Sequence, residues 1–319
     1  MTDYDKNSSP RNYIVTLIDV LGQKEHLEKH RFLTETTEGK ASLKTEDGQN
    51  KFKEIQEETY NKVLGLRRMF ENALSIFGKS ILNHPAYNTV PPEDQRIITN
   101  LAKPMFYQFF SDTIIIYAPL ASKDELKMRY RIATTICACM STMLIGFACG
   151  TFFRGGMEIG VGTEFPEGNG IYGLALNDAY HLENKVAGYP RIVVGNKLKE
   201  LIQCKERKAV YSKYWNDIND CLDDFCNSLI IKDKDSSFIV DFLGKTFAKL
   251  SLAISTGQSQ DYVGRGLVSI GDQYTKFLND KSEEGKKISS RYELLKNYYF
   301  ERLDNWGLSQ TTVTLDDTQ

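Results

Sequence analysis

Apolar residues occur along the chain at two spacings, one typical of strands and the other typical of helices. Short apolar runs flanked by polar or turn residues predict buried strands. Two such runs lie on either side of Ser111 and Asp112, which predicts a hairpin with an aspartate at its turn. The predicted strands of the first half of the chain cover residues 13–21, 109–110, 114–116 and 152–161.

Two longer stretches have helical spacing. Between 52 and 77 apolar residues recur on one side, and the segment 122–147 contains a similar stripe. Part of the second stretch belongs to an uncharged segment, 133–153, which is long enough to span a bilayer. Its threonines, serine and glycines favour instead a buried helix that ends near Gly150 and leads into a strand. The polar residues 23–50 predict the start of a helix followed by a mobile loop.

The second half of the chain alternates helices with short strands. From residue 13 onward, the order strand, helix, strand, strand, helix, strand is that of the split βαβ unit of ferredoxin-like domains. We therefore expect an α+β fold of this type with a helical C-terminal extension. Helices are predicted at 174–186, 196–203 and over most of 264–306, and strands at 191–194 and 237–243. The expected parts are a flexible N-terminus (1–12), a main domain (13–245), the extension (246–306) and a flexible tail (307–319).

Composition narrows the classes of function. The chain has 319 residues, 41% hydrophobic and 26% charged, which is the balance of a soluble globular protein. Its formal net charge of −2 gives no bulk attraction to nucleic acid or to anionic lipid, so we expect neither nucleic acid nor a membrane as a partner. The first residues contain no apolar secretion signal. The six cysteines form no zinc-binding pattern and are expected to be reduced thiols in a cytoplasmic protein.

Two aspartates stand where apolar strands end. Asp19 closes the first predicted strand, and Asp112 lies at the turn of the predicted hairpin. In a ferredoxin-like sheet the first strand and the hairpin are neighbours, so the two carboxylates could approach each other. Carboxylates at close range raise each other's pKa unless a cation lies between them. A bound Mg²⁺ or Mn²⁺ would explain the pair, and an ordinary structural role at a strand end or turn is the alternative.

Five short segments follow one another in a recognisable order. They are IDVLG (18–22), FSDTIIIY (110–117), RGGMEIG (154–160), GLALNDAYHLE (173–183) and RIVVG (191–195). The first places an aspartate three residues before a glycine, the third has the pattern R-x-G-x-x-x-G, and the fourth has the pattern G-x-x-x-N-x-A. Together these motifs resemble the class III nucleotidyl cyclases over residues 13–203.

The resemblance implies roles for individual residues. In class III cyclases two aspartates, matching Asp19 and Asp112, hold two divalent cations (Mg²⁺ or Mn²⁺), and the carbonyl of Val20 would be a further ligand. Sites of this family form between the two subunits of a head-to-tail homodimer, with the aspartates from one subunit and the asparagine from the other. The other matching positions would contact the nucleoside triphosphate: Gly22 and Arg154 its phosphates, and Asn177 its ribose.

Three positions depart from the purine-specific members of that family. Gln108 replaces the base-reading lysine four residues before the second metal aspartate, and Gly170 replaces the partner aspartate seven residues before the asparagine. Gln108 also does not match the acidic residue typical of guanylate cyclases. His181 occupies the position of the transition-state arginine and could carry a positive charge. Alternatively Lys185 or Arg191 reaches into the site, or catalysis is impaired.

A compact chain that carries these motifs but lacks the purine-reading lysine and aspartate resembles the bacterial pyrimidine cyclases of Pycsar anti-phage defence. That resemblance implies conversion of UTP or CTP to the 3′,5′-cyclic nucleotide and pyrophosphate, with a separate effector that responds to the product. We expect UTP rather than CTP, because uridylate cyclases are the commoner kind in that family. Tyr172, beside the expected base pocket, could restrict it to a pyrimidine or could be a core residue. The alternatives are an adenylate or guanylate cyclase with atypical base recognition and a catalytically silent, nucleotide-binding regulator.

Overall fold

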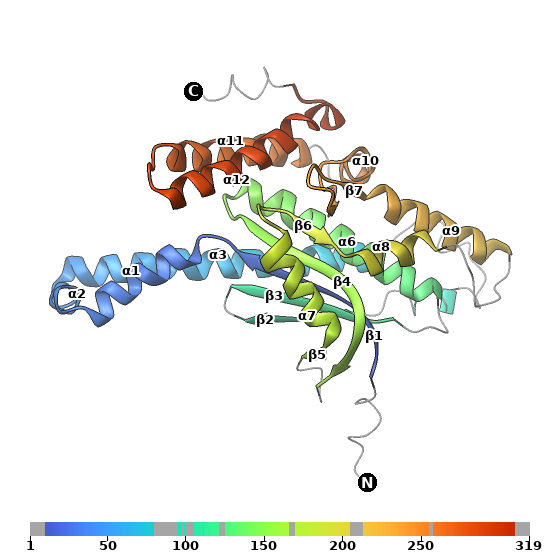
Figure 1. Cartoon of the computed structure of the whole chain (residues 1–319), viewed down its shortest axis with the longest axis horizontal. Helices are drawn as coiled ribbons and strands as arrows, with labels where there is room; N and C mark the ends of the chain where they lie inside the picture. The colour runs from blue at the N-terminus through green and yellow to red at the C-terminus, as the bar shows by residue number, and fades with distance from the viewer. Residues whose placement is uncertain are drawn as a thin grey trace, which may run out of the picture.

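The protein has an α+β fold built on one mixed sheet (Figure 1). The computed structural model describes residues 10–79, 95–96, 99, 105–110, 112–120, 125–165, 170–204, 213–254 and 258–309. The sheet has eight strands in the order β2-β3-β1-β4-β6-β8-β7, with β5 paired to β4. The strands are β1 (Arg11–Val20), β2 (Phe106–Phe110), β3 (Thr113–Pro119), β4 (Phe153–Glu164), β5 (Ile171–Gly173), β6 (Ile192–Val194), β7 (Ile230–Lys232) and β8 (Phe238–Val240).

The first strand lies in the middle of the sheet and is buried on both faces. It pairs antiparallel with β3 on one side and with β4 on the other. Because successive side chains of a strand point to opposite faces, Ile14 and Ile18 belong to the larger core, while Val15 and Leu17 belong to a smaller core on the other face. This two-sided burial explains why the run is continuously apolar rather than alternating.

Two long helices cover the face with the larger core. The helix α3 (Glu46–Gly78) buries Leu66, Phe70 and Phe77, which recur at helical spacing, and packs against α6 (Glu125–Ala148). By length and composition α6 alone among the described helices could cross a membrane, but 89% of its most apolar window is buried inside the protein. The predicted core helix is therefore confirmed, and it ends before Gly150, as expected.

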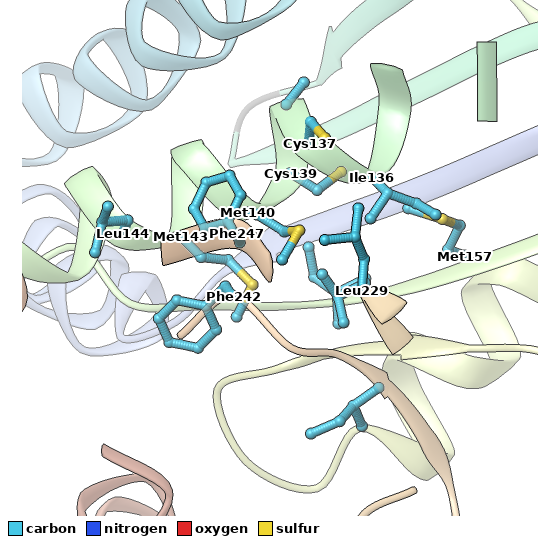
Figure 2. Close-up of a cluster of buried hydrophobic side chains, with 14 of the residues drawn as sticks. Ile136, Cys137, Cys139, Met140, Met143, Leu144, Met157, Leu229, Phe242 and Phe247 are labelled. Atoms are coloured by element: carbon cyan, nitrogen blue, oxygen red, sulfur yellow. The ribbon is translucent and has the colours of Figure 1, made fainter. Parts of the chain in front are cut away.

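Figure 2 shows part of the larger core, to which α6 contributes Cys137, Cys139 and Met140. Phe242 and Phe247, from the C-terminal part of the chain, belong to the same buried cluster. The two thiols are free and buried in the core. Burial raises the pKa of Cys137 and Cys139 far above the ordinary thiol value, so both stay protonated and unreactive.

The helix α7 (Leu174–His181) covers the other face and continues into a π-helical turn, η4 (Leu182–Val186). It packs on β1 and β4. A Cβ atom at Gly156 would lie only 2.1 Å from the carbonyl oxygen of Ala179, and one at Gly160 would lie 3.1 Å from the Cα of Ala175. The glycines of the RGGMEIG motif therefore let α7 approach the sheet closely.

The prediction of a mobile loop within 23–50 is wrong. This region forms α1 (Gln23–Glu35), α2 (Thr37–Ser42) and the start of α3, and α1 packs against both other helices. Thr36 and Thr45 cap the second and third helices, because their hydroxyl oxygens accept hydrogen bonds from the backbone N–H groups of Gly39 (3.0 Å) and Gly48 (3.1 Å). These local caps compensate for the low hydrophobicity of the segment.

The part of the chain after β6 is mainly helical, as predicted for 196–203 and for the extension from residue 246, whereas the helix at 213–228 was not predicted. Its helices are α8 (Asn196–Gln203), α9 (Lys213–Ser228), α10 (Lys245–Ile254), α11 (Gln258–Leu278), α12 (Glu283–Phe300) and η5 (Leu303–Trp306). The pair α11 and α12 lies side by side above the sheet, with α11 against α6 (Figure 1). Trp306 is fully buried, and its Nε1 donates to the carbonyl of Leu243 at 3.1 Å.

Most predicted strands and helices of the second half appear within a few residues of their expected bounds. The exact match is α8, and the predicted strand at 237–243 appears as the shorter β8. The first strand starts at Arg11, two residues before its predicted start. Residues 1–9 and 310–319, which make up most of the predicted flexible N-terminus and tail, lie outside the described part of the chain.

Candidate functional site

The sheet brings the two predicted metal aspartates to the same end of neighbouring strands. Asp19, near the end of β1, lies opposite Thr113 of β3 and opposite Arg154 of β4. Asp112 immediately precedes β3, and its carbonyl accepts a 3.1 Å hydrogen bond from the backbone N–H of Val20. The Asp19 carboxylate accepts a 3.2 Å hydrogen bond from the Thr113 hydroxyl.

A third carboxylate, which the sequence reasoning did not single out, completes the acidic group. Glu183 is only 3% exposed and accepts a hydrogen bond from Nε of Arg154 at 2.5 Å. Its place on the π-helical turn η4, directly above the closely packed Gly156, brings it to the strand that carries Arg154. The sequence feature that could have identified Glu183 is its position at the end of the GLALNDAYHLE motif, where an acidic residue ends an otherwise apolar helix face.

Negative charge is concentrated around Asp19. Its pKa is raised to about 6, first because the carboxylate is buried and then because Glu183 and Asp112 are negatively charged neighbours. The hydrogen bond from Thr113 and the charge of Arg154 act in the opposite direction without cancelling the effect. Among the described charged groups that act on Asp19, two are carboxylates and one is a guanidinium, so the net negative charge favours binding of a cation.

The donor set fits a hard divalent cation. Two carboxylates and a backbone carbonyl are oxygen ligands of the kind that Mg²⁺ and Mn²⁺ take, usually together with water or substrate phosphates. In the described segments no group of three or more His, Cys, Asp or Glu side chains lies close enough to hold a metal ion by itself. Asp19, Asp112 and the Val20 carbonyl would therefore hold a metal only with oxygens from a substrate or solvent completing the shell.

The two predicted base-reading positions lie against each other. A Cβ atom built on Gly170 would lie 2.9 Å from Oε1 and 3.1 Å from Nε2 of Gln108, although the residues are far apart in the sequence. Gly170 also has a φ of +138°, which disfavours any side chain there. Tyr172, in the adjoining strand β5, is 71% exposed, so the alternative that it is a core residue is wrong.

The predicted ribose and transition-state positions point to solvent. Asn177 and His181 are both exposed on α7, one turn apart, and no hydrogen bond or ion pair between described residues joins either of them to Asp19 or Asp112. Lys185 is exposed as well.

Arg191 is excluded as a substitute for the transition-state arginine. Its buried guanidinium binds the carboxylates of Asp233 and Asp235 and the backbone carbonyls of Val186 and Ala187.

The start of α1 also lies beside the aspartates. Gly22 is the N-cap of this helix and has a φ of 86°, a left-handed conformation that favours glycine. A Cβ at this position would meet no atom within 4 Å, so space is open in front of it. Gln23 follows and is 4% exposed, and neither polar atom of its amide has a hydrogen-bond partner in the structure as described.

Comparisons with protein-family models, with curated proteins and with solved structures gave no match. The functional assignment therefore depends on the motifs and on the geometry of the site.

Proposed function

We propose that this protein is a cytoplasmic, homodimeric, metal-dependent pyrimidine nucleotide cyclase that converts UTP, or CTP, to the 3′,5′-cyclic nucleotide and pyrophosphate. The observation that carries the proposal is the position of Asp19 and Asp112 at one end of adjacent strands, with the pKa of Asp19 raised to about 6 by burial and by negative neighbours. The product would act as a second messenger on a separate effector, in anti-phage defence.

The strand order supports the class III cyclase fold as part of this proposal. The strands β2-β3-β1-β4 are neighbours in that order, and each pairs antiparallel with the next. Helices connect β1 to β2 and β3 to β4. This is the arrangement of the split βαβ unit of ferredoxin-like domains, and it places the first strand beside the hairpin.

The residues at the strand ends have separable roles in the proposed reaction. Asp19, Asp112 and the Val20 carbonyl would hold the divalent cations, which on binding would lower the pKa of the attacking 3′-hydroxyl and neutralise the pyrophosphate leaving group. Thr113 orients the Asp19 carboxylate through its hydrogen bond. Glu183 holds Arg154 at the edge of the site through their ion pair.

Base selection is assigned to the contact between Gln108 and Gly170. An amide offers both a donor and an acceptor and can turn over, so it can pair with the edge of uracil or of cytosine. Gly170 leaves room for that amide, because a side chain at 170 would collide with Gln108. The purine-specific pair of lysine and aspartate is absent from these positions.

The exposed face of α7 supports a shared site between two subunits. Asn177 and His181 project from this face, which also exposes Leu174 and Tyr180 to solvent at 62% and 50%. Large apolar side chains grouped on a surface are typical of interfaces. If a second subunit covered this face, Asn177 and His181 of the first subunit would lie beside Asp19 and Asp112 of the second.

Two observations favour the silent, nucleotide-binding alternative. Arg154, expected at the phosphates, is paired with Glu183 inside one subunit, and His181 stands where an arginine is usual. Both features would weaken stabilisation of the transition state. This alternative predicts nucleotide binding without turnover.

Incubation with each of the four ribonucleoside triphosphates and Mn²⁺ tests the proposal. We expect a cyclic pyrimidine nucleotide and pyrophosphate from the wild type, no product from Asp112→Ala, and wild-type activity from Asp272→Ala, which removes an exposed carboxylate on α11. Preference for ATP or GTP would establish the atypical purine cyclase. Tight nucleotide binding with no product from any triphosphate would establish the silent regulator.

A further inference from the structure

A cavity of about 330 Å³ lies between the end of β1, the start of α1 and the C-terminal helices α11 and α12. Its wall begins with Val20, Leu21 and Gly22, the residues that directly follow Asp19. The C-terminal helices contribute Lys276 from α11 and Arg291 from α12. The proposed functional residues and the C-terminal extension therefore meet in one hollow.

The charged side chains that line this cavity are mainly basic. Lys29 of α1 and Lys62 of α3 join the two cations of the C-terminal helices, against the single carboxylate of Glu58. That carboxylate accepts a 2.8 Å hydrogen bond from Lys62. Four basic side chains against one acidic side chain give the hollow a net positive charge, although the whole chain is slightly acidic. Such a cavity concentrates anions.

Arg291 is the best placed of these cations to bind an anion. Its side chain is half-buried on the inner side of α12 and makes no hydrogen bond or ion pair with the described residues. Burial and the positive charge of nearby Arg154 lower the pKa of Arg291, and the negative charge of Glu284 acts in the opposite direction without cancelling the effect. Two guanidinium groups in one neighbourhood repel each other, and an anion bound between them would relieve that repulsion.

Phosphate is the anion that this arrangement suits. A guanidinium binds phosphate oxygens through two parallel hydrogen bonds, and ammonium groups add point charges. The open space in front of Gly22 gives a ligand access to the first backbone N–H groups of α1, which favour phosphate oxygens. The volume exceeds that of a single phosphate group and suits a chain of two or three.

We propose that this cavity binds a phosphate chain and that Arg291 and Lys276 make the C-terminal helices part of that binding site. If the proposed function holds, on which this assignment of the ligand rests, the chain is the triphosphate tail of the substrate. Arg291 then takes the phosphate-binding role for which Arg154, paired with Glu183, is not free. The same chemistry would also suit a separate polyphosphate ligand.

Calorimetric titration of the full chain with tripolyphosphate, in the absence of divalent cations, tests this proposal without requiring turnover. We expect saturable binding that Arg291→Gln weakens about tenfold or more and Lys276→Gln weakens less, because an arginine loses a bidentate contact. Arg265→Gln is the matched control, since Arg265 is an exposed arginine on α11, pairs with Asp261 at 3.5 Å and does not line the cavity. This control is expected to bind tripolyphosphate like the wild type.

The outcomes separate this inference from the proposed function. Arg291-dependent tripolyphosphate binding that competes with UTP or CTP supports the substrate tail as the ligand, and binding without competition supports a separate ligand. Tripolyphosphate binding that depends on Arg291, in a protein that turns over no nucleotide, supports the phosphate site and refutes the proposed cyclase activity. The inference is overturned if folded Arg291→Gln and Arg291→Lys variants bind tripolyphosphate as tightly as the wild type does, or if the wild type does not bind it.

Discussion

Asp19 is the residue at which burial, charge and proposed chemistry meet. An isolated aspartate has a pKa of 3.8, and the folded protein raises that value to about 6. Between these two values the folded state binds more protons at Asp19 than the unfolded chain does. The free energy of unfolding therefore falls as the pH rises through this window. A site that lowers stability near neutral pH is typical of function rather than of scaffolding.

Replacing Asp19 by asparagine tests the predicted decrease in the free energy of unfolding as the pH rises. The variant keeps an oxygen for the Thr113 hydroxyl but carries no charge, so it should be more stable than the wild type above pH 6, by about 1–2 kcal/mol after allowing for solvent screening. The difference should vanish below pH 3.8. Urea unfolding measured across this range checks the prediction. An Asp19→Asn variant that is less stable at pH 8 would contradict it.

A bound divalent cation should offset the loss of stability that the ionised Asp19 carboxylate causes. At pH 8 millimolar Mn²⁺ should raise the melting temperature of the wild type, because the cation binds the folded protein and not the unfolded chain. The increase should shrink at pH 5, where protons occupy Asp19, and should be absent in Asp19→Asn. Thermal unfolding with and without Mn²⁺ provides the measurement. Equal stabilisation of variant and wild type would remove Asp19 from the metal site.

Gln108 allows the base assignment to be tested separately from the metal site. In Gln108→Ala the amide beside Gly170 is lost, while the aspartates at the strand ends remain. We expect the ratio of UTP to CTP turnover to change on the order of tenfold or more, with a smaller loss of total activity, because a mismatched polar contact controls selectivity. Competition between the two substrates measures this ratio. An unchanged ratio would place Gln108 outside the base pocket.

Among the elements, α1, α2 and the first turns of α3 show where sequence patterns were insufficient. Beyond a helix start, their polar residues predicted a loop, yet Thr36 and Thr45 each cap a helix that follows. A threonine within a polar segment can be a cap or a loop residue, and only the packing of α1 against α3 decides between them. The strands β1, β3 and β4 and the helix α6 were predictable, because their apolar runs have no stable alternative to burial, whereas the short strands β5 and β7 were not predicted.

Removal of one cap should therefore have a measurable effect. Thr45→Ala deletes the acceptor for the backbone N–H of Gly48 and should lower the free energy of unfolding by about 1 kcal/mol. Thr45→Ser keeps the hydroxyl and is the matched control. Denaturant unfolding of the three proteins gives the comparison. Loss of stability in the serine variant equal to that in the alanine variant would mean that the methyl group, and not the cap, is responsible.

The candidate site was predictable in part for a similar reason. Asp19 and Asp112 were singled out because each stands where an apolar run ends, although an aspartate at such a position is common, and the strand order then brings them together. The pairing of Arg154 with Glu183 was not predictable, because it depends on how α7 and its π-helical turn approach β4 over Gly156. Contacts between segments that are distant in sequence need the packed structure.

At the scale of the whole molecule, the C-terminal helices and the sheet form one core. Phe242 and Trp306 are buried in the same cluster as the strands β1 and β4. Tyr298 donates to the carboxylate of Asp241 at 2.9 Å, and Arg302 pairs with the same carboxylate at 2.6 Å. This dense connection implies that α11 and α12 support the geometry of the cavity beside Asp19 rather than act as a detachable module.

Sharing of the site between subunits is tested by mixing two inactive proteins. Asp19→Ala removes a proposed metal ligand, and Asn177→Ala removes the proposed ribose contact, an exposed side chain on α7. In a head-to-tail dimer one site of each mixed pair would then carry both alanines, and the other would be wild type. Because random exchange makes half of the dimers mixed, about a quarter of wild-type activity should return. Product formation is measured after unfolding and refolding the equimolar mixture, with each variant refolded alone as the control. Recovered dimers without activity would show that Asp19 and Asn177 of one subunit serve the same site.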